Sequence, residues 1–305
     1  MTTDADRPAA TRAPADEGAR LGFRLTLPAQ VLVLFISAFP LLMQLYISLT
    51  DWSPLTGSPW PRAWEYWNGF ANYLDLVSDG RLWRSIWRTL LVVAVAVPIE
   101  FLLGLGLAML FVDDFPGKRV AYSILIAPMM VVPAVAGYMF FMLFQSGGPV
   151  NGLLSLFTAE PVALAWLSNP STALVAVIVA DIWQWTPLMF LILLAGLVGV
   201  PQDQLRAAAL LGASPAQRLV TIVIPRMKTI MLIALALRVI ECIKIFDTLF
   251  IMTGGGPGDA TQTLSVYIYD ITTQDLIWGY VAAIALAILV VLSAGAVWAM
   301  RRMAR

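Results

Sequence analysis

Charged side chains embedded in apolar sequence are the residues of this chain best placed to do chemistry. Four of them follow one another at intervals of three in one apolar stretch: Arg238, Glu241, Lys244 and Asp247. At about 100° per residue this spacing drifts slowly around a helix, so all four are expected on one broad face. Neighbours of opposite sign can pair along that face. Asp181 and Glu100, from two other apolar stretches, are candidates to join them.

These charges have two interpretations. Charge at bilayer depth is costly, so such residues usually face the interior of a helix bundle or an aqueous path. In the first interpretation they line a translocation path and meet a polar solute through charge-assisted hydrogen bonds. The candidates for this path are Asp181, Trp185, Glu241, Lys244 and Asp247. In the second interpretation the paired charges only fix the register of packed helices and do not touch solute.

Residues suited to covalent or metal chemistry are scarce. The chain has no histidine and a single cysteine, Cys242, which lies inside an apolar run. This excludes a disulfide framework and any cysteine-based zinc site, so neither a metal site nor a catalytic residue is expected. An intramembrane enzyme is a rival hypothesis, but the Gly-x-Ser-x-Gly and His-Glu-x-x-His patterns of hydrolases are absent from the sequence.

A glycine-rich segment and a Gly-Lys-Arg triplet do not qualify as nucleotide sites. No Lys-Ser/Thr follows the run from Gly254 to Gly258, and Gly117-Lys118-Arg119 lacks the upstream glycine and following Ser/Thr of a P-loop. The chain is therefore expected to bind no cofactor itself, and any ATP site must lie on another chain. Because 19 Lys and Arg residues balance 19 Asp and Glu residues, no overall basic field exists to attract nucleic acid.

The elements that must hold these side chains are membrane-spanning helices. Hydrophobic residues make up 60% of the 305 and charged residues only 12%, whereas a soluble domain carries about 25% charged residues. A helix needs about 20 mostly apolar residues to cross the hydrocarbon core. Six stretches qualify: 25–49, 87–112, 120–145, 172–199, 229–252 and 279–300. We therefore expect an all-α, polytopic membrane protein with six transmembrane helices.

Basic residues predict the orientation of these helices, because cytoplasmic loops carry an excess of Lys and Arg. With the N-terminus inside, 13 fall in cytoplasmic segments: Arg7, Arg12, Arg20, Arg24, Lys118, Arg119, Arg206, Arg218, Arg226, Lys228, Arg301, Arg302 and Arg305. Four fall in outer segments: Arg62, Arg81, Arg84 and Arg88. Both termini are therefore expected in the cytoplasm. Residues 1–24 are expected to form a disordered tail and 25–305 one transmembrane domain. The outer loop 50–86 is expected to form an ordered cap, with a flexible loop as the alternative.

The segment 200–228 is the longest of the expected cytoplasmic loops, and its sequence contains helix-capping signals. Pro201 suits the first turn of a helix, good helix formers follow over 202–211, and Gly212 then stops the helix. Ser214 caps a second short helix. The expected product is a helix–turn–helix elbow whose small side chains let another protein's groove approach the backbone. An ordinary amphipathic connector is the alternative.

Six residues of this elbow carry a family resemblance. Two alanines are followed after three residues by a glycine, and after nine more by Ile-x-Ile-Pro: Ala207, Ala208, Gly212, Ile222, Ile224 and Pro225. The spacing resembles the EAA loop of binding-protein-dependent ABC importer permeases, whose elbow sits in a cleft of the ATPase subunit. Arg206 stands where that family usually has Glu, so an ion pair made by that Glu does not carry over. The coupling residues implied are Arg206, Ala207, Ala208, Gly212, Ile222 and Pro225.

A second stretch narrows the resemblance. Residues 244–258, followed by 263–269, are similar to the fifth-span exit of carbohydrate permeases of the maltose and glycerol-phosphate transporter type. The path candidates Lys244 and Asp247 lie in this stretch. The resemblance implies a type I importer fold in the cell membrane. It also implies a second permease subunit, two ATPase subunits that bind ATP and Mg, and an extracytoplasmic solute-binding protein.

The function implied is import of a carbohydrate, or a related polyol or glycoside, by alternating access. An ion-gradient-driven secondary transporter is the second hypothesis. Carboxylates inside the membrane fit such a transporter, but a dedicated cytoplasmic elbow does not. The sequence does not indicate which solute is carried.

Overall fold

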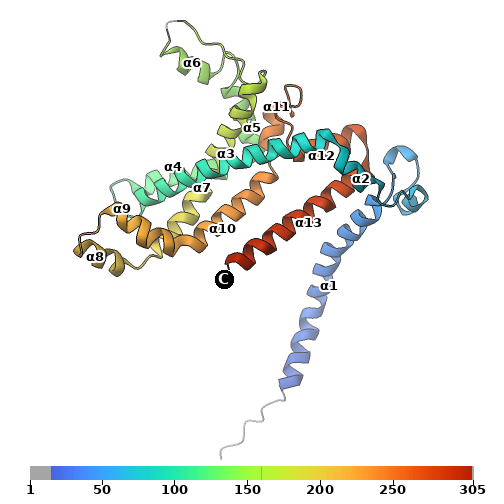
Figure 1. The fold of residues 1–305 in the computed structure, drawn as a ribbon, viewed down its shortest axis with the longest axis horizontal. Coiled ribbons are helices and arrows are strands. Elements are labelled where there is room, and N and C mark those ends of the chain that lie inside the picture. The colour runs from blue at the N-terminus through green and yellow to red at the C-terminus, as the bar shows by residue number, and fades with distance from the viewer. Residues whose placement is uncertain (1–14, 159, 304–305) are drawn as a thin grey trace, which may run out of the picture. The chain divides into compact units, whose positions relative to one another are not determined.

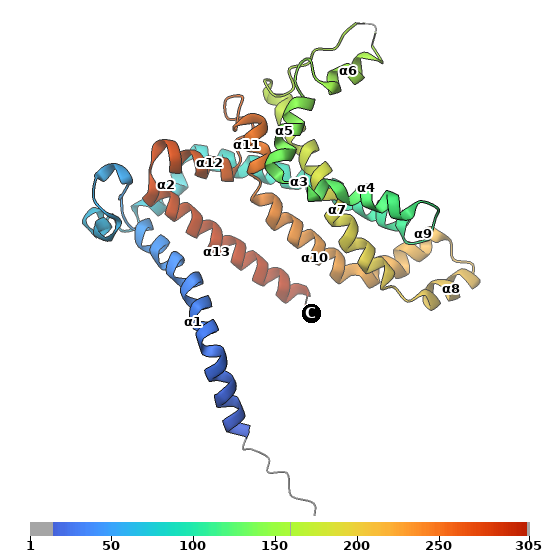
Figure 2. The ribbon, with the colours of Figure 1, turned by 180° about the vertical axis from the view of Figure 1, so that it is seen from behind.

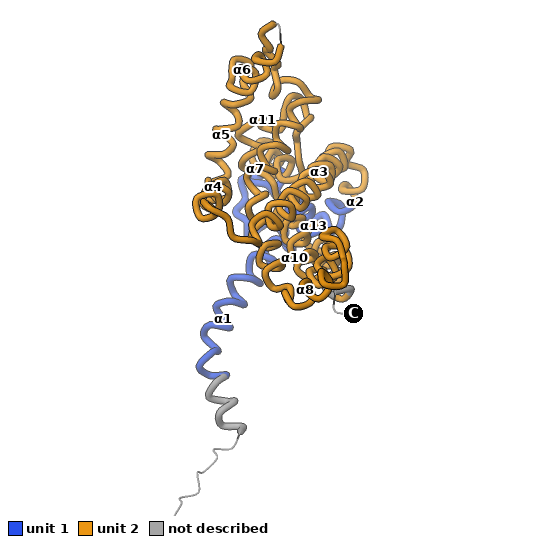
Figure 3. The backbone as a smooth tube through the Cα atoms, turned by 90° about the vertical axis from the view of Figure 1, so that its left-hand side faces the viewer, with its two compact units in different colours: residues 1–73, 277–287 blue, residues 74–276, 288–305 orange. Residues whose placement is uncertain are grey.

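A computed structural model describes residues 15–158 and 160–303 of the chain. Within these residues the secondary structure is helical, apart from one isolated β-bridge between Thr50 and Trp67 (Figures 1 and 2). Figure 3 shows that the chain divides into two compact units. Residues 1–73 and 277–287 form the first unit, and residues 74–276 and 288–305 form the second.

The first unit consists of one long helix, a loop of short turns and the beginnings of two further helices. Its elements are α1 (Ala15–Ser48), the 3-10 turns η1 (Pro54–Thr56) and η2 (Trp60–Tyr66), and the starts of α2 (Ala71–Ser78) and α13 (Trp278–Met303). Valine, leucine and phenylalanine side chains of α1 are exposed on all sides between Leu25 and Leu45. Such a surface requires apolar surroundings, which agrees with a helix in a membrane.

The loop after α1 is ordered by its own hydrogen bonds. The Asp51 N–H donates to the Tyr66 carbonyl at 2.9 Å. The Asn72 side chain donates to the carbonyls of Ser48 and Thr50, each at 3.0 Å. Gly279, at the start of α13, lies so close to the Thr50 carbonyl that a β-carbon there would overlap it. The expectation of an ordered cap is therefore confirmed for residues 50–72.

The second unit contains the remaining helices. Its elements are the end of α2, α3 (Gly80–Phe111), α4 (Lys118–Met130), α5 (Pro133–Leu143), α6 (Pro149–Ser155), α7 (Pro170–Val198), α8 (Gln202–Leu210), α9 (Pro215–Arg218), the π-helical turn η3 (Leu219–Val223), α10 (Ile224–Ile243), α11 (Asp247–Thr253), α12 (Leu264–Asp270), the π-helical turn η4 (Ile271–Asp275) and the end of α13. Its core lies mainly between α3 and α7. Met189, Phe190 and Leu193 of α7 are fully buried there, and the Phe190 ring meets the Phe111 ring of α3 edge to face.

The number of membrane spans agrees with the prediction. In the described part of the chain, five helices are long and apolar enough to cross a bilayer: Phe23–Ser48, Gly80–Phe111, Pro170–Val198, Pro215–Ile243 and Trp278–Trp298. The pair α4 and α5 makes a sixth when counted as one span. Helix α1 begins at Ala15, earlier than expected, and residues 1–14 of the predicted tail lie outside the described residues.

Two of the six predicted spans, 120–145 and 229–252, are broken in the structure. Helices α4 and α5 meet at an angle of 98°. Pro133 causes this break, because a residue before proline avoids the helical region, and Val132 accordingly has ψ 133°. Helix α10 ends at Ile243, and α11 starts at Asp247. No proline or glycine lies in the break between them.

Candidate functional site

Three of the membrane charges form one buried cluster in the second unit. Arg238 of α10 binds Glu100 of α3 with both arms of its guanidinium, Nε to Oε2 at 2.5 Å and Nη2 to Oε1 at 2.9 Å. The same Nη2 donates to Asp181 of α7. The three side chains are only 1%, 0% and 3% exposed. We call Glu100, Asp181 and Arg238 the buried triad.

The surroundings of the buried triad fix it further. The Trp185 ring lies 5.3 Å from the Arg238 guanidinium, in cation–π geometry. The Cys242 thiol donates weakly to Asp181 at 3.8 Å. Because its members come from three helices, the triad ties α3, α7 and α10 together at one level. Two buried carboxylates need such partners, since an unpaired charge at this depth is strongly disfavoured.

The other three charges of the predicted row lie elsewhere. Glu241 and Lys244 pair at 2.8 Å, and both side chains are about half exposed. Asp247 is exposed at the first turn of α11. The expectation of one broad helical face is therefore wrong for Lys244 and Asp247, because α10 ends at Ile243. The predicted pairing of neighbours is confirmed for Glu241 with Lys244, and whether any of them touches solute stays a prediction.

A polar junction that the sequence did not reveal lies one turn along α7 from Asp181. The Gln184 amide donates to the Val131 carbonyl, at the break between α4 and α5, at 2.9 Å. The Thr248 hydroxyl of α11 lies 3.0 Å from the Pro133 carbonyl and 3.3 Å from Gln184 Oε1. Gln184 and Thr248 are 2% and 5% exposed. These two side chains therefore bond the backbone at the break between α4 and α5.

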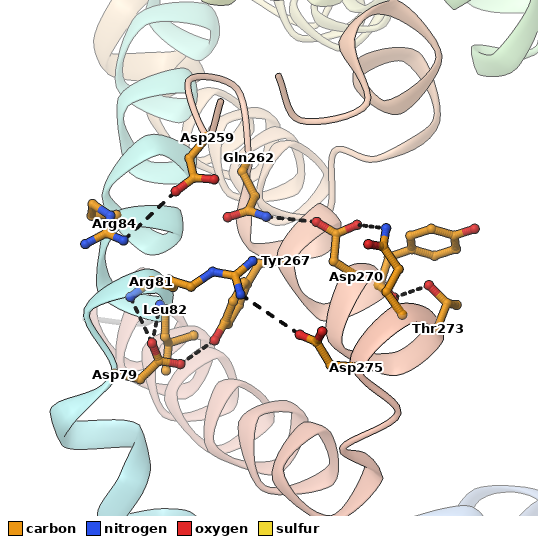
Figure 4. A network of polar contacts seen from close by, with 12 residues as sticks. Asp79, Arg81, Leu82, Arg84, Asp259, Gln262, Tyr267, Asp270, Thr273 and Asp275 are labelled. Carbon is orange, nitrogen blue, oxygen red and sulfur yellow. Dashed lines mark hydrogen bonds and ion pairs between the residues drawn. The ribbon is translucent and has the colours of Figure 1, made fainter. Parts of the chain in front are cut away.

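Polar side chains also gather where α3 begins, as Figure 4 shows. Asp79 caps α3 by accepting from the backbone N–H groups of Arg81 and Leu82, at 2.8 and 3.2 Å, and it also accepts from the Tyr267 hydroxyl of α12. Arg81 lies over the Tyr267 ring at 5.4 Å and 4.0 Å from Asp275. We call this cluster the α3 cap network.

The α3 cap network continues into the segment after α11. Arg84 approaches Asp259 at 4.0 Å, and Gln262 donates to Asp270 at 2.8 Å. Both ion pairs of the network are about half exposed, so each contributes at most about 1 kcal/mol. The sequence signal that was available is the N-cap pattern of Asp79 before α3, whereas the partners on α12 and η4 are distant in sequence.

The predicted elbow between α7 and α10 has the local structure that its sequence predicts. Helix α8 ends at Leu210, and Gly212 adopts the left-handed conformation with φ 85°. Ser214 and Gln217 then form a reciprocal capping box that opens α9. The helix–turn–helix is therefore confirmed, with Arg206, Ala207 and the proline before α8 exposed on it.

The elbow also exposes apolar residues that were not singled out from the sequence. Leu210 and Leu211 are 90% and 89% exposed. Ala208 and Ile222 are half-buried, while Gly212 is exposed. Two adjacent leucines in full contact with solvent favour an apolar partner. The exposed end of α8 therefore has the character of a protein contact site.

A family model and several relatives match most of this chain, and all of them are transport proteins. The family model described as binding-protein-dependent transport system inner membrane component matches residues 68–305 of this chain. A probable ABC transporter permease of Sinorhizobium fredii is 37% identical over 246 residues, which cover 80% of this chain and 77% of that protein. The trehalose/maltose transport system permease protein MalF of Thermococcus litoralis is 34% identical over 254 residues, 83% of each protein.

A third relative and a solved structure extend the comparison. The trehalose transport system permease protein SugA of Mycobacterium tuberculosis is 34% identical over 252 residues, covering 82% of this chain and 78% of that protein. Among solved structures, a chain of a bacterial alginate ABC transporter in complex with a periplasmic protein superimposes with a TM-score of 0.78. The superposition covers 93% of both chains at 17% identity, so it concerns the fold alone.

Proposed function

This chain belongs to the family of binding-protein-dependent transport system inner membrane components, and on that premise we propose that it imports a carbohydrate or a related polyol or glycoside. Two of the relatives are named as trehalose or trehalose/maltose permeases. The observation that carries the coupling role is the exposed elbow of α8 and α9, with its unpartnered leucine pair. An ion-gradient-driven transporter is not favoured, since the relatives belong to ABC systems.

The elbow is proposed to couple the chain to an ATPase subunit. Its coupling residues are Arg206, Ala207, Ala208, Gly212, Ile222 and Pro225. Leu210 and Leu211 add an apolar contact, of the kind that fills a pocket at the centre of an interface. Arg206 carries a positive charge where the family usually has a carboxylate, so its contact on the ATPase is a carboxylate or a helix C-terminus.

The assembly proposed has this chain beside a second permease subunit in the cell membrane, with both termini in the cytoplasm. Two ATPase subunits bind ATP and Mg, and this chain binds no cofactor and hydrolyses nothing. An extracytoplasmic solute-binding protein delivers the solute. The α3 cap network lies on the side proposed to face it, and its exposed Arg81, Arg84, Asp259 and Asp275 offer both signs of charge for orientation.

Transport is proposed to follow alternating access. Nucleotide binding draws the ATPase subunits together and moves the elbow, and the helices joined to it open the central path to one side at a time. Asp181, Trp185, Glu241, Lys244 and Asp247 remain the candidates for this path. Of these, the exposed Glu241, Lys244 and Asp247 are the accessible ones in this conformation.

Uptake into proteoliposomes tests the proposed function. The chain is purified with its native partners, reconstituted, and supplied with the solute-binding protein and labelled trehalose or maltose. We expect uptake that requires ATP and Mg in the vesicle lumen, on the side of the ATPase subunits. This uptake should persist when proton and sodium gradients are collapsed. Uptake driven by an ion gradient without ATP would instead identify a secondary transporter.

Replacing Gly212 with valine is expected to uncouple ATP hydrolysis from uptake. A β-branched residue at φ 85° costs about 1–2 kcal/mol in this conformation, which reorients the turn between α8 and α9. No atom lies within 4 Å of the added β-carbon, so insertion and folding are expected to remain intact. The measurement is the ratio of solute transported to ATP hydrolysed in proteoliposomes.

Gly117→Val is the matched control. Gly117 has φ 82°, is exposed, and also has open space around an added β-carbon, but it lies in the short loop before α4. The same backbone strain there is expected to leave the coupling ratio unchanged. Equal loss in both variants would show that backbone strain alone, rather than the elbow's contact with the ATPase, lowers the ratio.

A further inference from the structure

Two interrupted spans of the second unit meet at one place. The break between α4 and α5 lies at Val131 and Val132, and the break between α10 and α11 lies at 244–246. Each break leaves backbone carbonyls without a helical partner. Such groups must be satisfied inside the protein at membrane depth, because lipid offers no hydrogen bonds.

Two side chains bond carbonyls at the break between α4 and α5, and one of them, Thr248, belongs to α11 directly after the other break. Gln184 of α7 donates to Val131 O at 2.9 Å, and Thr248 of α11 reaches Pro133 O at 3.0 Å. The link between them is the approach of the Thr248 hydroxyl to Gln184 Oε1 at 3.3 Å. Both side chains are buried, so water does not compete for these bonds. One hydrogen-bonded chain therefore runs from one broken span to the other.

The segments that follow the two breaks are packed tightly against each other. A β-carbon on Gly137 of α5 would lie 3.0 Å from Ile251 Cβ and 3.1 Å from the Thr248 carbonyl of α11. Only glycine permits this approach. By contrast, α4 packs mainly against α7, and α10 packs against α3 and α7. Helices α5 and α11 thus pack mainly against each other, with smaller contacts to α7, and each is separated by a break from the helix preceding it.

We propose that Gln184 and Thr248 are positioning residues that join the two breaks into one hinge, so that α5 and α11 move as a single rigid body relative to α4 and α10. The inference rests on the proposed transport function for its role in the cycle. The hydrogen bonds between the two breaks are proposed to exist whether or not nucleotide is bound. The hydrogen bonds tie the start of α11 to the start of α5, so rearrangement of one break shifts the other.

Spin-label distances in the reconstituted complex test the hinge. One label pair, Ile124 of α4 with Met142 of α5, crosses a break, and both sites are exposed. A second pair, Met142 with Asp247 of α11, lies inside the proposed body. The native Cys242 is fully buried, so the chain without added cysteines provides the labelling blank. Distances are recorded without nucleotide and in the vanadate-trapped state.

We expect the distance across the break to shift between the two states and the distance within the body to stay constant. In Gln184→Leu, the distribution across the break broadens even without nucleotide, and ATP-driven uptake falls about tenfold, the factor that corresponds to 1.4 kcal/mol. Thr248→Val is expected to behave similarly, while Thr248→Ser keeps the hydroxyl and restores the narrow distribution. If Gln184→Leu fails to insert into the membrane, the two Thr248 variants still test the hinge.

Thr186→Val is the matched control on α7. Thr186 is buried, but its hydroxyl bonds only to the Ile182 carbonyl of the same helix at 2.6 Å, so both distributions should remain those of the unmodified chain. A Met142–Asp247 distance that changes as much as the Ile124–Met142 distance overturns the rigid body. A Thr248→Val chain with an unchanged distribution overturns the hinge. Absence of ATP-driven uptake in the unmodified complex contradicts the proposed function, and the nucleotide-free distributions still decide the hinge.

Discussion

Arg238→Met is expected to lower the amount of folded chain in the membrane to a small fraction of that of the unmodified chain. The substitution leaves Glu100 and Asp181 buried without their counter-ion. Breaking a buried ion pair by removing one partner costs about 3–5 kcal/mol, a large share of the about 5–15 kcal/mol that stabilises a typical protein. The measurement is the amount of chain in detergent-extracted membranes, together with its thermal unfolding midpoint.

Lys244→Met provides the matched comparison on the adjoining segment. Lys244 also has an acidic partner, Glu241, but both are about half exposed, and an exposed pair contributes about 0–1 kcal/mol. Its removal should leave the amount of chain and the unfolding midpoint nearly unchanged. Similar losses for the two variants would contradict the assignment of the large effect to burial.

Neutralising all three members of the buried triad separates its two interpretations. In the Arg238→Met, Glu100→Gln, Asp181→Asn chain no charge remains unpaired, and replacement of whole buried ion pairs is often tolerated. We expect the amount of folded chain to recover. Recovery of uptake as well would assign the triad to helix packing, whereas recovery of folding without uptake would assign it to the transport cycle.

Gly104→Val is expected to force α3 away from α7. A β-carbon at Gly104 would lie 2.8 Å from Met189 Cβ and 2.9 Å from the Phe190 backbone nitrogen. Backbone cannot yield as the end of a flexible side chain does, and overpacking of a core costs about 1–3 kcal/mol or more. We expect a lowered unfolding midpoint and loss of uptake, since this contact carries the core that surrounds the triad.

Gly106→Val, two residues further along α3, is the control for helix propensity. No atom lies within 4 Å of a β-carbon at Gly106, so the same change in backbone preference occurs without a collision. The unfolding midpoint should stay close to that of the unmodified chain. A drop as large as that of Gly104→Val would mean that valine destabilises α3 by itself.

Hydropathy predicted the spans because a bilayer imposes a minimum length on an apolar helix. All six predicted stretches contain helix in the structure, and the start of α7 at Pro170 lies close to the predicted 172. The elbow was predictable for a local reason. Gly212 and the capping box of Ser214 act within one turn, so their sequence spacing determines their structure.

The partner of Arg238 was not predictable in the same way. Spacing by three favoured Glu241 as its partner, yet the guanidinium is bound by Glu100 and Asp181, 138 and 57 residues away in sequence. Tertiary packing chose these partners, because they let the charge be buried with its hydrogen bonds satisfied. Only one of the two helix breaks could be predicted from the sequence. Pro133 indicates the break between α4 and α5, whereas no proline or glycine indicates the break between α10 and α11.

The order in which the buried triad is synthesised has a consequence for biogenesis. Glu100 is made first, Asp181 next and Arg238 last, and 138 residues separate the first from the last. At about 5–20 residues per second this interval lasts on the order of 10 s. Glu100 is committed to an apolar helix without its cation throughout this interval, and Asp181 joins it for the last 57 residues. A ribosome-bound chain that ends before Arg238 should therefore remain associated with the insertion machinery, and release its helices into lipid only when α10 has emerged.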